Sequence, residues 1–384
     1  MSDKYKVAFA TGSRADYGIV RNYISKLNTD PDIDFSILAT GALLSENYGS
    51  AINLIEDDGF KIDFRNKIEQ RVSEIDDTVS IMSKVLSDFS SFFSAHKYDL
   101  VIILGDRYEI YSVAIAAAMH RLPILHLHGG EITLANYDEF IRHSITKMAQ
   151  FHITSTEEYR RRVIQLGENP NRVFNLGALG AENCHSINLD NVPLELRDIK
   201  NSFTVLFHPE TLNKITPAKQ IEEVLLALKR YSDNYKFVFI GSNADTHSDQ
   251  IMSRINNFCN ENGCMFYENL HPDAYHYLVK KSYALIGNSS SGIIEVPSLG
   301  SFTINIGDRQ TGRAKGKSII DVACNAEEIV RAIDYVIAHK DDVINDDIYY
   351  THDTANLYYI KTKEILEVLP NLGFKTFYDI KFSC

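Results

Sequence analysis

The chain alternates short apolar runs with stretches of helical periodicity, and this alternation limits it to few folds. Each run ends in a glycine or a polar cluster. The runs cover 6–12, 35–41, 99–106, 123–130, 151–156 and 173–178 in the first half, and 204–210, 236–243, 264–270, 283–290, 302–308 and 319–324 in the second. Continuous apolar strands alternating with helices are typical of parallel sheets covered on both faces. We therefore predict an α/β fold with one Rossmann-like sheet in each half.

A length of 384 residues is enough for two domains, each with its own core. We predict an N-terminal domain over 1–185, a C-terminal domain over 203–365 and a last segment, 366–384, that packs back on the first domain. The stretch 181–202 has no strong pattern and is expected to hold the linker. After Asn325 the chain is predicted to be helical to about Leu369.

One helix can be delimited from local signals. Residues 157–166 have helical periodicity, Ser155 and Glu158 have the spacing of a capping box, and Gly167 is placed to end the helix.

Composition excludes several classes of partner. The formal net charge of −12 argues against nucleic acid and anionic membranes, which need a surplus of Lys and Arg. No apolar run is long enough to cross a bilayer, and the first residues, MSDKYKVAFATG, lack the pattern of a signal peptide. We expect a soluble, cytoplasmic protein. The five cysteines form neither a CxxC motif nor a Cys/His cluster, so we expect reduced thiols and no structural zinc site.

Polar motifs follow many of the predicted strands. Open parallel sheets bind ligands beyond the carboxyl ends of their strands. The motifs at that position are TGSRADYG, LGDRYE, HLHGGEIT, FHPET, IGSNADTHSD, NLHPDAY, GNSSSG and IGDRQTGR. We therefore predict a cleft between the two sheets that these loops line.

Ionisable residues gather after two neighbouring strands of the first half. They are Asp106, Arg107, His128, Glu131 and, on the helix that Asp138 opens, Arg142 and His143. Because parallel strands lie about 4.8 Å apart, these groups can converge on one substrate. Neighbouring carboxylates raise one another's pKa, which lets one act as an acid and another as a base.

Structural roles are the alternative for several of these residues. Asp138 can cap its helix and Arg142 can pair with it, while His126 is expected to point into the core. His128, Glu131, Asp138 and His143 could also ligate a metal, but no HExxH-type spacing supports this, and we expect no metal.

Phosphate-binding features occur in both halves. The turn TGSRADYG offers backbone N–H groups, Arg14 and Asp16, although it lacks the GxGxxG spacing of a dinucleotide site. GNSSSG offers Ser289, Ser290 and the positive end of a helix dipole as a cradle for a diphosphate. The alternatives are ordinary turn geometry and a helix cap with surplus serines.

Further candidates surround that cradle. Glu295, one turn into the predicted helix, is spaced to contact a sugar hydroxyl such as those of ribose. Arg309 and Arg313 supply local positive charge, with solvated side chains as the alternative. His208 of FHPET is predicted to face the ionisable cluster across the cleft and to assist a leaving phosphate.

These motifs, from GSRADYGIVR and HGGEITLANYDEFIRHSITKMA to FHPET, GNSSSG and INIGDRQ, closely resemble the hydrolysing UDP-N-acetylglucosamine 2-epimerases of bacterial sialic acid synthesis. The resemblance covers about residues 5 to 325. It implies a GT-B fold with UDP in an interdomain cleft. It also implies a reaction without NAD or another cofactor, which eliminates UDP to give 2-acetamidoglucal and then adds water to give N-acetylmannosamine.

The resemblance also assigns residues. Asp106 and Asp138 match catalytic carboxylates, and His208 matches the histidine near the leaving group. Where many relatives have HxEGGE this chain has HLHGGE, so His128 and Glu131 are both catalytic candidates. The candidate UDP-sugar contacts are Arg14, Asp16, Arg107, Arg142, Asn243, His271, Ser289, Ser290, Glu295, Arg309 and Arg313.

The expected partners are a UDP-sugar and further copies of the chain, as a dimer or tetramer. Three other functions remain open. One is hydrolysing epimerisation of a UDP-diacetamido sugar on the legionaminic acid route. The others are a GT-B glycosyltransferase and a catalytically silent nucleotide-sugar sensor, against which the intact acid/base set argues.

Overall fold

The computed structural model describes residues 4–44, 52–68, 75–133, 138–208, 210, 215–241, 248–342 and 347–381. The chain forms two compact units. The first comprises 1–131, 137–179 and 351–384, and the second comprises 132–136 and 180–350. No helix in the described ranges is long and apolar enough to cross a membrane.

The first unit is built on a seven-stranded parallel sheet with the order β3-β2-β1-β4-β5-β6-β7. Its strands are β1 (Tyr5–Thr11), β2 (Ile33–Ala39), β3 (Ile62–Arg65), β4 (Leu100–Leu104), β5 (Ile124–Leu127), β6 (Phe151–Thr154) and β7 (Val173–Asn175). The six predicted strands are confirmed. The sequence did not indicate β3, because its sequence IDFR alternates half-buried and exposed residues at the sheet edge instead of forming an apolar run.

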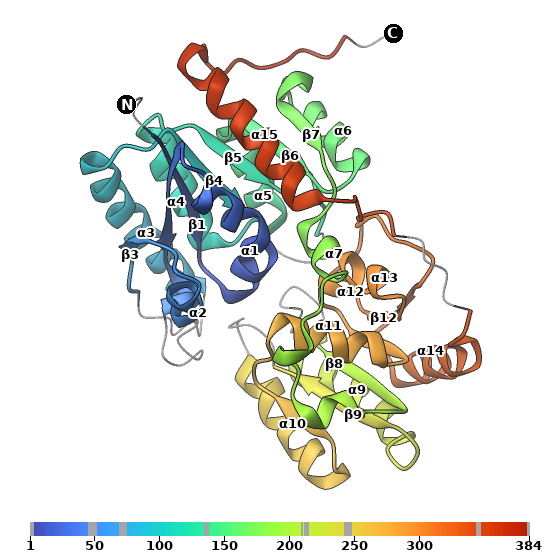
Figure 1. The fold of residues 1–384 in the computed structure, drawn as a ribbon. Coiled ribbons are helices and arrows are strands. Elements are labelled where there is room, and N and C mark those ends of the chain that lie inside the picture. The colour runs from blue at the N-terminus through green and yellow to red at the C-terminus, as the bar shows by residue number, and fades with distance from the viewer. Residues whose placement is uncertain are drawn as a thin grey trace. The chain divides into compact units, whose positions relative to one another are not determined.

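Helices cover both faces of this sheet (Figure 1). They are α1 (Arg14–Thr29), α2 (Ile52–Asp57), α3 (Ile75–Ala95), α4 (Tyr108–Met119), α5 (Asp138–Met148), α6 (Glu157–Gln165) and α15 (Thr354–Val368). Val7 and Phe9 of β1 pack in the core that α1 and α15 cover, and Ala8 and Ala10 pack in the core that α3, α4 and α5 cover. This alternation follows from the two-residue period of a strand.

The N-cap of helix α6 lies one residue later than predicted. Thr156 is its N-cap and accepts a hydrogen bond from Tyr159 N, so the predicted Ser155 capping box is wrong. Ser155 instead donates to the Glu131 carboxylate. The predicted stop is confirmed, since Gly167 follows the helix with φ +85°.

The end of the chain is not continuously helical. Helix α14 (Ala326–His339) and α15 are separated, and the described residues 347–353 between them are not helical, which corrects the prediction. In Figure 1 the red helix α15 lies with the strands of the first unit. Tyr358 on α15 donates to the carbonyl of Gly177 at 2.8 Å, and Tyr23 on α1 bonds to Thr362 at 2.7 Å. Further on, Lys375 donates to the carbonyl of Thr146.

The second unit holds a six-stranded parallel sheet with the order β10-β9-β8-β11-β12-β13. The strands are β8 (Ser202–Leu206), β9 (Lys236–Ile240), β10 (Met265–Tyr267), β11 (Ala284–Gly287), β12 (Phe302–Ile306) and β13 (Ile319–Val322), as predicted. The helices, besides α14, are α8 (Leu194–Arg197), α9 (Pro217–Lys229), α10 (Ser248–Asn262), α11 (Pro272–Lys281), α12 (Ser291–Ile294) and α13 (Val296–Leu299), and α7 (Leu179–Asn183) lies where the two units join in the sequence. Val192, Leu196 and Ile199 are buried in this unit.

Candidate functional site

The loops after β4 and β5 lie side by side at the carboxyl edge of the first sheet. The two strands are paired in parallel, with Leu104 opposite Leu127. Gly105, with φ +74°, turns the chain after β4, and His128, with φ +62°, turns it after β5. A left-handed conformation is uncommon for a residue other than glycine and often occurs at functional sites. Because β4 and β5 are paired, the two loops that follow them lie together, as predicted.

Arg142 of α5 connects these loops. Its side chain is buried, and its guanidinium forms an ion pair with Asp106. The same group donates to the main-chain oxygen of Glu131 at 2.7 Å and lies 3.3 Å from Glu139 Oε2. One arginine thus joins the ends of two strands and its own helix, which fixes the position of the Asp106 carboxylate.

His128 and Glu131 form one pair. His128 Nδ1 lies 3.3 Å from Glu131 Oε1, and Ser155 donates to the same oxygen at 3.0 Å. Both residues are buried. His128 Nε2 is also buried and has no hydrogen-bond partner among the described residues. A buried nitrogen of this kind is available to a ligand group.

Glu109 belongs to the same site and was missed by the sequence analysis. It is fully buried in the first turn of α4, and Arg107 donates to its Oε1 at 2.6 Å. A Cβ atom on Gly12 would lie 2.8 Å from that oxygen, so the glycine lets the turn before α1 approach the carboxylate. The available signal was an acidic residue in an otherwise apolar helix, YEIYSVAIAAAM.

Asp16 lies in the first turn of α1, close enough to Arg107, Glu109 and His128 to interact with them electrostatically. Burial raises the pKa of Asp16 to about 6, while Arg107 and a hydrogen bond with Ser13 oppose the rise. Arg14, the first residue of α1, is partly buried, and burial lowers its pKa.

The Asp16 shift predicts how stability depends on pH. The unfolded chain releases this proton near pH 3.8 and the folded chain near pH 6, so stability is lost as the pH rises through this window. A shift of one pKa unit corresponds to about 1.4 kcal/mol, so the free energy of unfolding is lowered by up to about 3 kcal/mol above pH 6. Asp16→Asn should therefore be more stable than the wild type by a margin that is larger at pH 8 than at pH 5. Urea unfolding at both pH values measures this margin, and an equal margin would contradict the assignment.

Helix α6 supports the turn that contains Gly129 and Gly130. Gly130 has φ +82°, and a Cβ atom there would lie 2.5 Å from the carbonyl oxygen of Tyr159, so the turn requires glycine. Arg162 donates to the Gly130 carbonyl at 2.6 Å.

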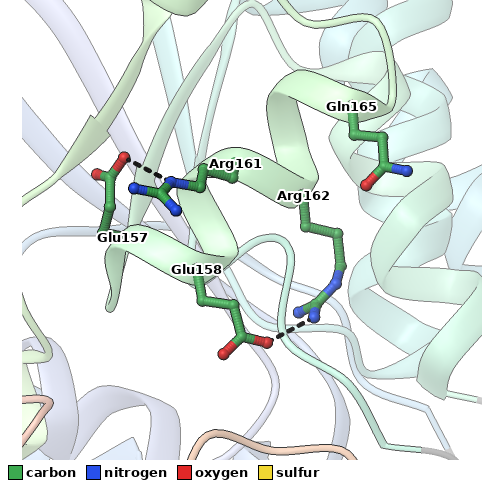
Figure 2. A pocket seen from close by; sticks show the side chains of 5 residues that line it. All are labelled: Glu157, Glu158, Arg161, Arg162 and Gln165. Carbon is green, nitrogen blue, oxygen red and sulfur yellow. Dashed lines mark hydrogen bonds and ion pairs between the residues drawn. The ribbon is translucent and has the colours of Figure 1, made fainter.

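Figure 2 shows a hollow beside α6 in which Glu158 pairs with Arg162 and Glu157 with Arg161. Because these charges compensate one another, we do not regard the hollow as the substrate site.

The remaining histidines of this region have structural contacts. His126 is fully buried, as predicted, and bonds to the carbonyl of Gly105 at 2.9 Å and to Thr146 at 3.2 Å. Burial lowers its pKa to about 3. His143 Nε2 lies 3.1 Å from Glu139 Oε1. Asp138 is the first residue of α5, as predicted.

In the second unit, Asn288 organises the loops after β8, β11 and β12. Its side-chain amide makes two hydrogen bonds with the backbone of His208, at 2.7 and 2.9 Å. Its main-chain carbonyl oxygen accepts hydrogen bonds from the side chains of Arg309, at 3.1 Å, and Gln310, at 2.8 Å. The predicted residues His208 and Arg309 are thus brought together.

Glu210 stabilises the same loops and was also missed. Its Oε1 accepts hydrogen bonds from the backbone N–H groups of Asp308 and Arg309, at 2.8 and 2.9 Å. A Cβ atom on Gly307 would lie 2.4 Å from that oxygen. The partners are about a hundred residues away in sequence, so no local pattern indicated this role.

A helix begins within the segment GNSSSG, as predicted, but this helix is short. Helix α12 has four residues, and Glu295 is both its C-cap and the N-cap of α13. A four-residue helix has little dipole to offer a phosphate, so the donors available here are hydroxyl and backbone groups. Ser289 Oγ bonds to Ser291 Oγ at 3.0 Å, and Tyr275 bonds to Ser291 at 2.6 Å. Ser290 precedes the helix without a capping bond from its side chain.

Other predicted contacts are more dispersed. His271 is the N-cap of α11 and accepts from Asp273 N at 3.2 Å. Arg313 is partly buried, and its backbone N–H donates to the carbonyl of Gln310. Asn243 lies outside the described residues.

The fold brings together a cysteine, a histidine and a glutamate that are far apart in sequence. Ligand atoms of Cys184, His276 and Glu295 all lie within 4.8 Å of one another. The sequence showed no Cys/His cluster, because Cys184 follows α7, His276 lies on α11 and Glu295 follows α12, so the three come together only in the folded unit.

Comparison with known proteins gives concordant matches. The family model described as UDP-N-acetylglucosamine 2-epimerase matches residues 25–360. Polysialic acid biosynthesis protein P7 of Escherichia coli is 46% identical over 381 residues, which are 98% of this chain and 97% of that protein. The GDP/UDP-N,N'-diacetylbacillosamine 2-epimerase (hydrolyzing) of Campylobacter jejuni is 39% identical over 332 residues, 84% of this chain and 85% of its own.

A solved structure has the same fold. The UDP-GlcNAc 2-epimerase from Neisseria meningitidis bound to UDP-GlcNAc superposes with a TM-score of 0.76 at 16% identity, covering 94% of this chain and 100% of that one. The predicted α/β class, with two Rossmann-like parallel sheets of the GT-B type, is confirmed.

Proposed function

The chain belongs to the UDP-N-acetylglucosamine 2-epimerase family, and from this premise we propose that it hydrolyses UDP-N-acetylglucosamine to UDP and N-acetylmannosamine. The relative from Escherichia coli, named for polysialic acid biosynthesis, supports a role in supplying sialic acid. The relative from Campylobacter jejuni, whose name includes "hydrolyzing", supports the use of water.

The proposed reaction has two steps. In the first, a base removes the proton from C2 while the C1–O bond breaks, so that UDP leaves and a C1–C2 double bond forms in 2-acetamidoglucal. In the second, water adds its oxygen to C1 and C2 receives a proton on the opposite face, which inverts that carbon. The C2 proton is weakly acidic, so the protein must stabilise developing charge and supply both an acid and a base.

The observation that carries this proposal is the cluster that Arg142 connects in the first unit. It places the Asp106 carboxylate beside the loop that contains His128 and Glu131. We assign Asp106 and Asp138 to proton transfer. We assign the His128–Glu131 pair to a second proton transfer, in which Glu131 orients the imidazole and Nε2 faces the substrate. Arg107 and Asp16 contribute to sugar binding.

We assign nucleotide binding to the second unit. Arg309, Ser289 and Ser290 would bind the diphosphate, and His208 would donate a hydrogen bond to it as the C1–O bond breaks. Glu295 would accept hydrogen bonds from the ribose. The contacts of Asn288 and Glu210 support this role, since they fix both the His208 backbone and the Arg309 backbone.

A second candidate substrate is a UDP-2,4-diacetamido sugar, because the Campylobacter relative is named for one. The same two steps would apply, and only the groups at C4 and C6 would differ. Relative kcat/KM values for the two UDP-sugars distinguish the candidates.

Incubation with UDP-N-acetylglucosamine in deuterated water tests the proposed chemistry. We expect free UDP and N-acetylmannosamine with deuterium at C2, both visible by NMR. A glycosyltransferase would release no such sugar without an acceptor, and a binding protein would release no UDP. Either of these results, or N-acetylmannosamine with hydrogen at C2, would contradict the proposal.

A further inference from the structure

We propose that His276 is a positioning residue, which orients the Glu295 carboxylate for the ribose hydroxyls and so makes the site selective for ribonucleotides over 2′-deoxyribonucleotides. This inference rests on the proposed function, which assigns Glu295 to the ribose. It adds a residue that the sequence did not indicate.

Glu295 lies at the junction of two short helices. It is the C-cap of α12 and the N-cap of α13, whose second residue is Pro297. Its backbone N–H donates to the carbonyl of Ser291 at 2.8 Å. A residue at such a junction has few helical neighbours that could fix the position of its side chain. The orientation of its carboxylate therefore depends on other elements.

Helix α11 provides that contact. His276 Nε2 lies 3.0 Å from Glu295 Oε2, and the His276 side chain is 6% exposed. The other carboxylate oxygen, Oε1, accepts no hydrogen bond from any described residue. A carboxylate fixed through one oxygen presents the second to a ligand hydroxyl in a defined direction.

Two further contacts limit how Glu295 can move. A Cβ atom on Gly180 would lie 3.0 Å from Oε1, so this glycine provides just enough room for the carboxylate. Cys184 Sγ lies 3.5 Å from the main-chain oxygen of Glu295 and 3.3 Å from that of Gly180, in positions where the thiol can donate. Both the backbone and the carboxylate of Glu295 are therefore restrained.

A zinc site is the competing interpretation of the same three side chains. Burial and the nearby Glu295 carboxylate raise the pKa of the Cys184 thiol, so it stays protonated. A protonated thiol that donates to two carbonyl oxygens is a poor zinc ligand. The contacts of Cys184 and His276 are accounted for by restraint of Glu295 alone.

The test compares UDP with 2′-deoxy-UDP by isothermal titration calorimetry. The wild type should bind UDP more tightly, by on the order of tenfold or more, because the carboxylate loses its partner when the 2′-hydroxyl is absent. His276→Leu should lose most of this preference, through a UDP affinity about tenfold weaker and an unchanged affinity for 2′-deoxy-UDP. Retained binding of 2′-deoxy-UDP shows that the variant is folded. His276→Gln, which keeps a donor, should restore the preference in part.

Two controls separate this inference from the proposed function. His339→Leu on α14 should change neither affinity. Glu295→Gln should reduce the preference as His276→Leu does, and the double variant should lose no more than either single one. If His276→Leu keeps the preference while Glu295→Gln loses it, the role of His276 is wrong and the ribose assignment stands. If the wild type has no preference, the assignment of Glu295 itself fails.

Discussion

Asp106→Asn is expected to lower kcat about a thousandfold, while the dissociation constant of UDP stays within about twofold of the wild-type value. Asparagine has the same shape as aspartate and can still accept a hydrogen bond from Arg142, so the loop after β4 should keep its conformation. It cannot take up or release a proton, and proton transfer by a positioned group contributes about 10²–10⁴-fold to rates. A coupled assay for UDP release and calorimetry with UDP measure the two quantities.

Asp99→Asn is the matched control, because Asp99 precedes the same strand at its opposite end and accepts a hydrogen bond from Lys6 N at 2.8 Å. It should leave kcat within about twofold of the wild type, as is usual for surface changes. The assignment of Asp106 would be wrong if Asp106→Asn weakened UDP binding as much as it reduced turnover. Such a result would indicate ground-state binding instead of proton transfer.

The parallel sheets could be predicted from the sequence because their strands are buried on both faces. Strands such as LVIIL in β4 leave a continuous apolar signal, whereas IDFR in β3 does not, since an edge strand buries little. Helix ends were less predictable. Ser155 and Thr156 are both good N-caps, and which of them serves as the cap depends on whether a distant acceptor, here Glu131, binds the other.

The candidate site was predictable where residues follow strand ends, and not where contacts are long-range. Asp106 and His128 could be placed because Leu104 and Leu127 end neighbouring strands. The pairings of Glu210 with the backbone of Arg309 and of His276 with Glu295 depend on how loops pack, which no period or spacing reports. The length of α12 could not be predicted either, because the signal in GNSSSG indicates where a helix begins and not that it ends before Glu295.

Arg142→Met is expected to lower the free energy of unfolding by about 3–5 kcal/mol, and with it the activity. Methionine fills much of the same space, so the loss comes from charge and hydrogen bonding. The change leaves the Asp106 carboxylate without its ion pair and the main-chain oxygen of Glu131 without a donor, in a region where both are largely shielded from water. Urea unfolding measures the loss.

Two variants decide whether the ion pair is the cause of that loss. In Arg142→Met with Asp106→Asn the unpaired charge is absent, so the double variant should be more stable than Arg142→Met alone, by on the order of 1–2 kcal/mol. Arg161→Met on α6 removes an arginine that is exposed and 3.5 Å from Glu157, and it should cost less than about 1 kcal/mol. If the double variant were no more stable than Arg142→Met, the arginine would stabilise the unit through packing of its aliphatic stem, and Asp106 would tolerate burial without it.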